Sequence, residues 1–466
     1  MINRIKAPLT AVAAAVVLSG CSGLLDVDNP NSLVEESIRQ EAAANGVANG
    51  SLYLVSEAIG DVWEGPAVVA DELYWIGSRD AWQSLDQGFI SDPSNEFTDG
   101  AFPNLGQAVW MAQNAVEILA GHVANSSDPD QFQVDYGRTL MFRGMILMVI
   151  AESQQDMTFS YKQVDGAPVS SGNATIGSEG NEIPVASMGA VMALAISSLD
   201  QARAIFAAEG EDELELDANA LLARAEMSEE IMTARNSAGG AIQFADAVPY
   251  AQYVLANGDA DYRLNLSYSA ASTDCNMCGN VNDRKENQVD QSLVTVDASN
   301  DIDGIQLQDP YGSGDEPALI TALNQFKGGN YLESGNQYPD LTVASARLMH
   351  LILAEHALAG GTGTGDTFQG HINTLRALDA GYTTTYGGGD DVNALQHHRR
   401  VNTFLMGLRL QDMYRWGIQA GDDTNTVPEA RWQAASDAIQ RPGSMLPITL
   451  IEVRANCNLN GQGCGG

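Results

Sequence analysis

The chain has 466 residues and a formal net charge of −37, with 60 Asp and Glu against 23 Lys and Arg. A surface this acidic repels nucleic acid and anionic lipid head groups, so we expect neither as a partner. With so many carboxylates some acid pair occurs at any spacing, and such pairs therefore carry no information about catalysis. The length allows a large core, and no Pro/Ser-rich linker divides the chain.

The first twenty residues have the three parts of a bacterial secretion signal. Arg4 and Lys6 precede an apolar run over residues 7–18, and Ser19-Gly20-Cys21 completes a lipobox. The run is shorter than the roughly 20 residues of a permanent membrane helix, so we expect residues 1–20 to be removed. Cys21 would then carry a diacylglycerol and a further acyl chain such as palmitate, which together anchor stably. The alternative is a secreted protein with a chance cysteine at the cleavage site.

Lysine is scarce after the predicted signal peptide. Only Lys162, Lys285 and Lys327 follow residue 20, while Asp and Glu are spread along the whole chain. We attribute this composition to a solvated surface suited to a salty habitat rather than to a polyanionic binding tail.

Apolar residues at helical spacing dominate the chain. Ser32-Leu-Val-Glu35 fits a capping box before the first apolar face. The predicted helices cover approximately residues 32–59, 109–120, 132–152, 188–208, 218–233, 244–256, 341–358, 367–378 and 392–416. The small residues among the apolar ones in 132–152 suit close helix pairing.

The pattern predicts an all-α, mainly helical fold of paired, tetratricopeptide-like helices with one large loop-rich insertion. We expect a single domain over 21–466, divided into a tether (21–31), an N-terminal helical part (32–256), the insertion (257–339) and C-terminal helices with a tail (340–466). Loops as long as this insertion are usually functional.

Four cysteines besides Cys21 predict two disulfides in an oxidising compartment, with three possible pairings. Cys457 and Cys464 flank a short polar loop that closes easily. Cys275-Asn-Met-Cys278 has the spacing of a redox motif or half of a zinc site, but no βαβ pattern and no second Cys/His pair accompany it. A structural bridge in a surface loop is the preferred interpretation.

Four separated segments carry recognisable motifs. They are Cys21-Ser-Gly-Leu-Leu-Asp26 with Pro30-Asn31; Ala346-Arg347 and Ala354-Glu355-His-Ala357 with Asn373 and Arg376; Arg400-Val-Asn-Thr-Phe404, Gly407-Leu-Arg409 and Asp412-Met-Tyr-Arg415-Trp416-Gly417; and Leu446-Pro447-Ile448-Thr449 with Glu452 and Asn456. In this order they resemble the SusD/RagB family of nutrient-binding lipoproteins. Met406 and His398 stand where the family commonly has acidic residues, which indicates a divergent branch.

The resemblance implies a helical fold with tetratricopeptide-like units and an outer-membrane lipoprotein exposed at the cell surface. It implies that the protein caps a TonB-dependent transporter of the SusC type. It also implies capture of a glycan, or in some branches a peptide, before import.

One stretch between residues 63 and 97 concentrates aromatic and charged side chains. Trp75, Arg79, Asp80 and Trp82 form a candidate ligand-binding edge, because sugars stack their apolar faces on aromatic rings while polar groups bind their hydroxyls. The alternative is that the tryptophans pack the core and Arg79 pairs with a nearby acid.

Within the insertion, Tyr311, Phe326 and Tyr331 lie among Gly and Asp. Exposed aromatic rings are costly without a ligand, so Tyr311 and Tyr331 are further candidates, unless these rings pin the insertion to the scaffold.

Three polar motifs do not predict a cofactor or a metal. Residues 299–304 imitate part of a calcium loop but lack its last ligand, so an ordinary acidic turn is expected. Residues 360–365 form a glycine-rich loop without a preceding strand or a following lysine. His397-His398 beside Arg399 and Arg400 predicts a solvated helix turn.

We expect a binding protein and no enzyme. A surface glycoside hydrolase, with two carboxylates about 5 to 9.5 Å apart, and a helical-repeat scaffold with only protein partners are the competing hypotheses. No Ser-His-Asp spacing or metal-ligand motif singles out a reacting centre.

Overall fold

The computed structural model describes residues 35–158, 160–161, 170–171, 174–175, 177–178, 185–235, 239–418, 431–455 and 459. The signal peptide, the tether with Cys21, the start of the capping box, Asn456, Cys457 and Cys464 lie outside these residues. The chain forms two compact units, residues 1–44 and residues 45–466. The described part of the first contains α2 (Glu35–Ile38) and η1 (Glu41–Ala43).

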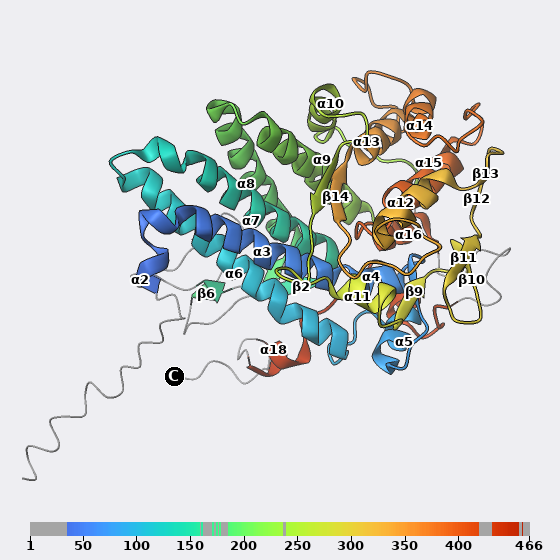
Figure 1. Cartoon of the computed structure of the whole chain (residues 1–466), viewed down its shortest axis with the longest axis horizontal. Coiled ribbons are helices and arrows are strands. Elements are labelled where there is room, and N and C mark those ends of the chain that lie inside the picture. Colours follow the sequence, from blue (N-terminus) through green and yellow to red (C-terminus); the bar gives the residue numbers. More distant parts are fainter. Residues whose placement is uncertain are drawn as a thin grey trace, which may run out of the picture. The chain divides into compact units, whose positions relative to one another are not determined.

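Helices dominate from residue 44 onward, as the periodicity predicts (Figure 1). In the N-terminal part they are α3 (Ala44–Val62), α4 (Glu64–Val69), α5 (Asp80–Asp86), α6 (Glu96–Asn125), η2 (Pro129–Phe132), α7 (Gln133–Ser153), α8 (Met188–Glu209), α9 (Asp212–Ala234) and α10 (Val248–Asn257). Later in the chain they are α11 (Asn276–Asn282), α12 (Pro317–Lys327), α13 (Ala346–Leu358), α14 (Phe368–Ala377), α15 (Asp391–Asn402), α16 (Arg409–Trp416), α17 (Asp437–Gln440) and α18 (Leu450–Ala455).

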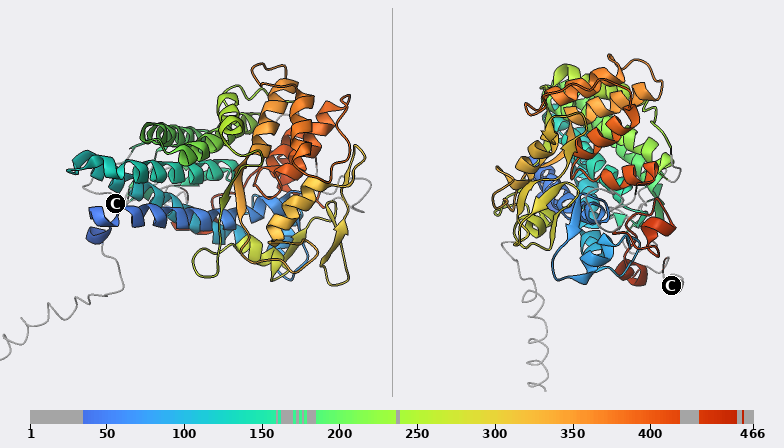
Figure 2. Two further views of the ribbon diagram at one scale, coloured as in Figure 1. Left: turned by 45° about the horizontal axis from the view of Figure 1, so that its top comes forward. Right: turned by 90° about the vertical axis from the view of Figure 1, so that its right-hand side faces the viewer.

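The long helices pack in series, mostly each against the next helix along the chain. Contacts join α6 to α7, α7 to α8, α8 to α9 and α9 to α10, and then α10 to α13 and α13 to α14 (Figures 1 and 2). Serial packing of paired helices is how tetratricopeptide-like units bury a continuous core. The predicted mainly helical, tetratricopeptide-like fold is confirmed.

Close packing of α7 on α8 depends on small residues in α7. A Cβ atom at Gly144 would lie 2.5 Å from Leu199 Cγ, and one at Gly137 would lie 2.7 Å from the Phe206 ring. Because real Cβ atoms do not approach so closely, glycine is required for this helix separation. The close pairing predicted for this helix is confirmed.

Helix α8 is long and apolar enough to span a bilayer by length and composition. It packs against both α7 and α9, with Val191, Ala195, Leu199 and Ala202 fully buried between them. A helix in the core of a protein can pass the same test, so the length and composition of α8 alone are weak evidence for a membrane span.

The insertion contains more secondary structure than the predicted loop-rich segment. Residues 257–339 include α11, α12 and the strands β8 (Arg263–Leu266), β9 (Asn287–Val289), β10 (Val294–Val296), β11 (Ile302–Ile305), β12 (Gln308–Asp309) and β13 (Gly314–Asp315). Two of these strands pair with strands outside the insertion, both in antiparallel orientation. Strand β9 pairs with β1 (Leu73–Trp75), and β8 pairs with β14 (Leu341–Ser345). The insertion is therefore joined to the helical scaffold by backbone hydrogen bonds.

The remaining strands are short. They are β2 (Asp156–Thr158), β3 (Ser160–Tyr161), β4 (Ser170–Ser171), β5 (Ala174–Thr175), β6 (Gly177–Ser178) and β7 (Val185–Ser187). Strand β2 pairs with β7, β3 with β6 and β4 with β5, so they form two-stranded ladders between α7 and α8 in the chain.

The prediction of one continuous helix over residues 392–416 is wrong, because non-helical residues separate α15 from α16. Leu405 has φ 55° and Gly407 has φ 75°, a backbone conformation that ends a helix. A Cβ atom at Gly407 would lie 2.6 Å from Trp63 Nε1, so the turn packs directly on that ring.

The solvated helix turn predicted for residues 397–400 is also wrong. His398 and Arg399 are fully buried. Arg399 Nε lies 2.8 Å from Asp412 Oδ2, and Asp412 Oδ1 lies 2.8 Å from Arg415 Nε. Arg415 pairs in turn with Glu355 of α13. Charges are retained in this interior because each is paired, which a local sequence pattern does not reveal.

Cys275 and Cys278 are joined by a disulfide at the start of α11. Both residues are fully buried within the main hydrophobic core, so the bridge does not lie in a surface loop as expected. Cys275 Sγ also accepts a hydrogen bond from the Cys278 backbone amide, which caps the helix.

Candidate functional site

Strands β1 and β9 bring the predicted binding edge to the insertion. Leu73 pairs with Val289 and Trp75 with Asn287. Beyond the ladder the Ile76 and Gly77 amides donate to the Glu286 carbonyl at 3.1 and 3.0 Å. We call the surface built around this ladder, from residues 75–104 and 276–335, the β1–β9 junction; Figure 1 shows α11 and β9 beside α4 and α5. Two pockets open at the junction.

The first, the acidic pocket, has a volume of about 190 Å³. Its lining comes from α3 to α6 and from α11: Asp61, Glu64, Arg79, Trp82, Glu96, Phe97, Gly100, Ala101, Asn104, Asn276, Asn280 and Arg284. Two of the predicted site residues, Arg79 and Trp82, therefore lie in one pocket.

The aromatic rings of the acidic pocket pack on each other. The Trp82 and Phe97 ring centroids are 3.8 Å apart with an interplanar angle of 12°. The Arg79 guanidinium lies over Phe97 at 5.5 Å from its centroid. Trp82 is only 3% exposed, so its ring forms the pocket wall and offers no free face for stacking. Its Nε1 is buried and has no hydrogen-bond partner among the described residues.

Three carboxyl groups line the acidic pocket, and those of Glu64 and Asp61 have raised pKa values. Burial raises the pKa of Glu64 to about 8, although Asn280 and Asn287 each donate to it at 2.8 Å. Burial likewise raises the pKa of Asp61 to about 6, against hydrogen bonds from Asn104 and Asn276. The pocket thus combines amides, protonatable carboxyls and a guanidinium, which together suit a ligand rich in hydroxyl groups.

The second pocket, the lysine pocket, has a volume of about 520 Å³ and lies within the insertion. It is lined by Val281, Asn282, Lys285, Gln288, Asp297, Asp301, Ile302, Asp303, Lys327, Tyr331, Leu332, Glu333, Ser334 and Gly335. Tyr331, a predicted site residue, is half-buried here, and the neighbouring Leu332 is 50% exposed. The pocket offers aromatic, apolar, amide and charged groups within one concave surface.

The other predicted site residues lie outside both pockets. Trp75 is half-buried in β1 and packs against the core, and Asp80 is exposed at the start of α5. Tyr311 lines neither pocket, and its ring contacts Tyr386 at 4.9 Å and the Arg376 guanidinium at 5.3 Å. Tyr311 thus packs on the C-terminal helices, in agreement with the alternative that such rings pin the insertion.

One cluster near Tyr311 has the ligand types of a metal site. The nearest ligand atoms of Asp309, Glu316 and His397 lie within 4.8 Å of one another. Arg376 donates to both Asp309 oxygens at 2.8 and 2.9 Å, and Tyr382 and His397 bond to Glu316. The carboxylates are thus engaged by an arginine, a phenol and an imidazole, and we assign the cluster to ion pairing.

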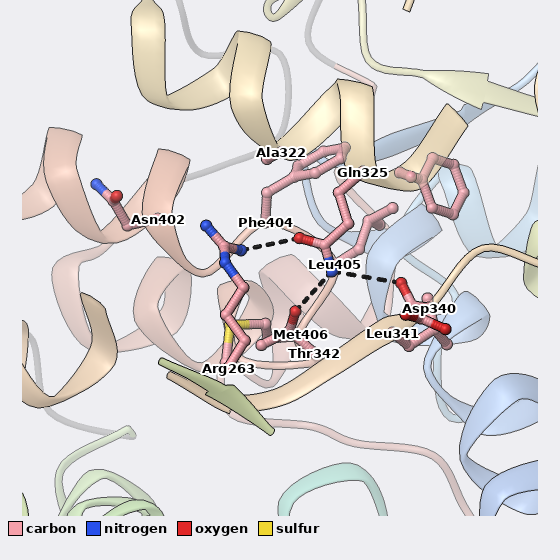
Figure 3. A pocket seen from close by; sticks show the side chains of 11 residues that line it. Arg263, Ala322, Gln325, Asp340, Leu341, Thr342, Asn402, Phe404, Leu405 and Met406 are labelled. Atoms are coloured by element: carbon pink, nitrogen blue, oxygen red, sulfur yellow. Dashed lines mark hydrogen bonds between the residues drawn. The ribbon is translucent and has the colours of Figure 1, made fainter. Parts of the chain in front are cut away.

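A small cavity beside β14 is lined by polar groups that already bond to each other. It measures about 40 Å³, enough for a water molecule. Figure 3 shows Gln325 at its centre, bonded to Arg263 at 2.9 Å and to the Thr342 hydroxyl at 2.8 Å. These bonds tie α12 to the β8–β14 ladder, so the cavity is structural.

Most pocket residues are not identified by the sequence interpretation. Asp61, Asn276 and Arg284 meet only because β1 pairs with β9, some 200 positions further along the chain. The scarcity of lysine is a sequence feature that could have pointed to a site. Two of the three lysines beyond residue 20, Lys285 and Lys327, line one pocket.

Solved structures similar to this chain include SusD-like proteins. A SusD superfamily protein from Bacteroides thetaiotaomicron matches with a TM-score of 0.65 and 14% identity, over 90% of this chain and 98% of that one. A SusD-like carbohydrate binding protein from Bacteroides fragilis gives a TM-score of 0.59 and 12% identity, over 90% and 99%. A laminarin binding SusD-like protein gives 0.51 and 14%, over 79% and 91%.

Comparisons with protein-family models and with curated proteins found no match. The structural matches cover nearly the whole length of the first two proteins, at an identity that carries information on the fold alone. The chain therefore has the SusD-like fold that its sequence motifs predict.

Proposed function

We propose that this protein binds an oligosaccharide at the β1–β9 junction and takes no part in its chemical conversion. The observation that carries the proposal is the β1–β9 pairing in a SusD-like fold. It joins the segment before Arg79 and Trp82, which line the acidic pocket, to the insertion that contains the lysine pocket. Two structural neighbours with the same fold are a SusD-like carbohydrate binding protein and a laminarin binding SusD-like protein. A peptide is the alternative ligand.

The lipid anchor and the transporter belong to the same proposal. The lipobox ending at Cys21 supports attachment to the outer membrane, and the ordered family motifs support a place beside a SusC-like TonB-dependent transporter. Ligand captured at the junction would then be delivered to that transporter. Cross-linking of the membrane-anchored protein in its membrane, followed by affinity purification, tests this part. Absence of any TonB-dependent barrel from the cross-linked complex would contradict it.

A glycoside hydrolase is the second candidate because the acidic pocket contains two carboxyl groups with raised pKa values, Asp61 and Glu64. Both accept hydrogen bonds from asparagine amides, which favours a structural and hydroxyl-binding role. Incubation with the saccharides that bind, followed by product analysis, separates the two functions. Release of shorter saccharides that is lost in Glu64→Gln would establish hydrolysis instead.

Binding is tested with a glycan array followed by calorimetry on the best ligands. Arg79→Ala removes an exposed guanidinium from the acidic pocket, and we expect it to weaken binding about tenfold or more. Arg441→Ala is the matched control, because Arg441 is exposed, pairs with Asp437 and lines neither pocket. Equal affinities of the two variants, or no saccharide binding by the wild type, would contradict the proposal.

A further inference from the structure

We infer that the lysine pocket holds a negatively charged group of the ligand, a carboxylate or a sulfate, against the ammonium of Lys327. This inference rests on the proposed function and narrows its ligand class to acidic saccharides. Lysine is rare in this chain, and two of the three lysines after residue 20, Lys285 and Lys327, line this pocket.

Lys327 is a buried cation with no counter-ion in contact. The residue is 8% exposed and lines the lysine pocket. Among the residues that the structure describes, no hydrogen bond or ion pair reaches Lys327 Nζ. Buried charges are normally paired, so an unpaired ammonium facing a pocket indicates a partner that binds there.

The position of Lys327 is fixed by the fold around it. It is the last residue of α12, which ends at Gly328 with φ 74°. Asn282 of α11 donates to the carbonyls of Phe326 and Asn336 at 2.9 and 2.7 Å, which holds the end of α12 against the following loop. The ammonium is therefore presented by a rigid frame, as a binding site requires.

Burial lowers the pKa of Lys327 to about 8. Asp301 raises this pKa and Lys285 lowers it, so the nearby charges partly cancel. An anion in contact with the ammonium would favour its charged form and raise the pKa again.

The carboxylates of the pocket have other partners. Asp301 pairs with Lys285 at 2.8 Å. Asp297 accepts the backbone amides of Ser299 and Asp301 at 2.7 and 3.0 Å, and Asp303 accepts the Thr295 hydroxyl at 2.6 Å. Glu333 is the fourth, with a longer contact of 3.4 Å from Asn330. Carboxylate oxygens can accept more than one hydrogen bond, so these groups suit the hydroxyl groups that surround the charge of an acidic sugar.

Pairs of saccharides that differ only in charge test the inference with the full-length protein in detergent. Oligogalacturonate is compared with its methyl ester, and a sulfated fucan oligosaccharide with its desulfated form. We expect the charged member of one pair to bind at least tenfold more tightly. Lys327→Met should reduce this affinity to that of the neutral member, while Arg441→Met should leave it unchanged.

A second measurement does not depend on the folding of a variant. Nuclear magnetic resonance of ¹⁵N-lysine-labelled wild-type protein follows the Lys327 amine, whose pKa should rise when the charged oligosaccharide saturates the protein. An unchanged pKa, or a Lys327→Met variant that retains the preference for the charged member, would overturn the inference. Neutral members that bind as tightly as charged ones would overturn it and leave the proposed function standing. Failure of every saccharide to bind would remove both.

Discussion

Lys327 is an ammonium group that the fold buries at a cost to stability. Because its pKa falls to about 8 from 10.5, the unfolded chain binds more protons than the folded chain between these pH values. The free energy of unfolding should therefore rise with pH over this interval, and the cost is largest below pH 8. The dipole at the end of α12 offsets only part of it.

Lys327→Met should accordingly stabilise the ligand-free protein at pH 7, by up to about 3 kcal/mol in the free energy of unfolding. The gain should shrink as the pH rises through 10.5, because only above this value does the lysine become mostly neutral in the unfolded chain as well as in the folded one. Denaturant unfolding at pH 7 and pH 10 measures this, with Arg441→Met as control. Destabilisation at pH 7 would show that the ammonium has a stabilising partner.

Glu64 should give the opposite pH dependence. Burial raises its pKa from 4.5 to about 8, so near neutral pH the folded chain holds a proton that the unfolded chain releases. Its contribution to stability is full below pH 4.5 and decreases as the pH rises to 8, by up to about 1.4 kcal/mol per pH unit. The difference in unfolding free energy between wild type and Glu64→Gln should therefore change in favour of the variant between pH 5 and pH 8. If this difference in unfolding free energy stayed constant between pH 5 and pH 8, Glu64 would already be charged in the folded protein, which would contradict the prediction.

At the scale of elements, α13, α15 and α16 are held together by paired charges rather than by apolar side chains alone. Arg415 contacts both Asp412 and Glu355, and all three are buried. Arg415→Met removes the cation and leaves two carboxylates in the interior. We expect the free energy of unfolding to fall by about 3–5 kcal/mol, measured by denaturant titration. A loss below about 1 kcal/mol, no larger than that of the exposed control Arg441→Met, would contradict this role for the network.

Sequence periodicity predicts elements where local signals and packing agree. Helices α7, α8 and α14 lie where predicted, because each has an apolar face at helical spacing. The helix predicted for residues 341–358 begins only at Ala346, because residues 341–345 form β14 and pair with β8. The same reasoning failed at residues 392–416, where Gly407 adopts a positive φ to pack on Trp63 and divides the predicted helix. It also placed buried, paired charges in solvent, because pairing with distant residues has no local signature.

The candidate site is predicted only in part, for the same reason. Arg79, Trp82 and Tyr331 line the two pockets, whereas Trp75, Asp80 and Tyr311 do not. The sequence gives no information on which face of an aromatic ring is covered, and the Trp82 ring is buried in the wall of the acidic pocket. The polar pocket residues come from segments that only the β1–β9 pairing brings together.

At the scale of the whole molecule, the anchor and the binding surface should be separable. Cys21→Ala removes the predicted acylation site, and we expect the protein to leave the membrane fraction while its saccharide affinity stays within about twofold. Membrane fractionation and calorimetry measure the two properties. Loss of both properties would contradict a role of Cys21 in anchoring alone.

The proposal assigns saccharide binding to the β1–β9 junction. Hydrogen–deuterium exchange with and without the tightest saccharide tests it most directly, because it surveys the whole chain at once. The account predicts protection of backbone amides in residues 76–104 and 276–335. Protection confined to another surface, such as the cleft of about 470 Å³ lined by Tyr53, Phe142 and Asn265, would contradict it.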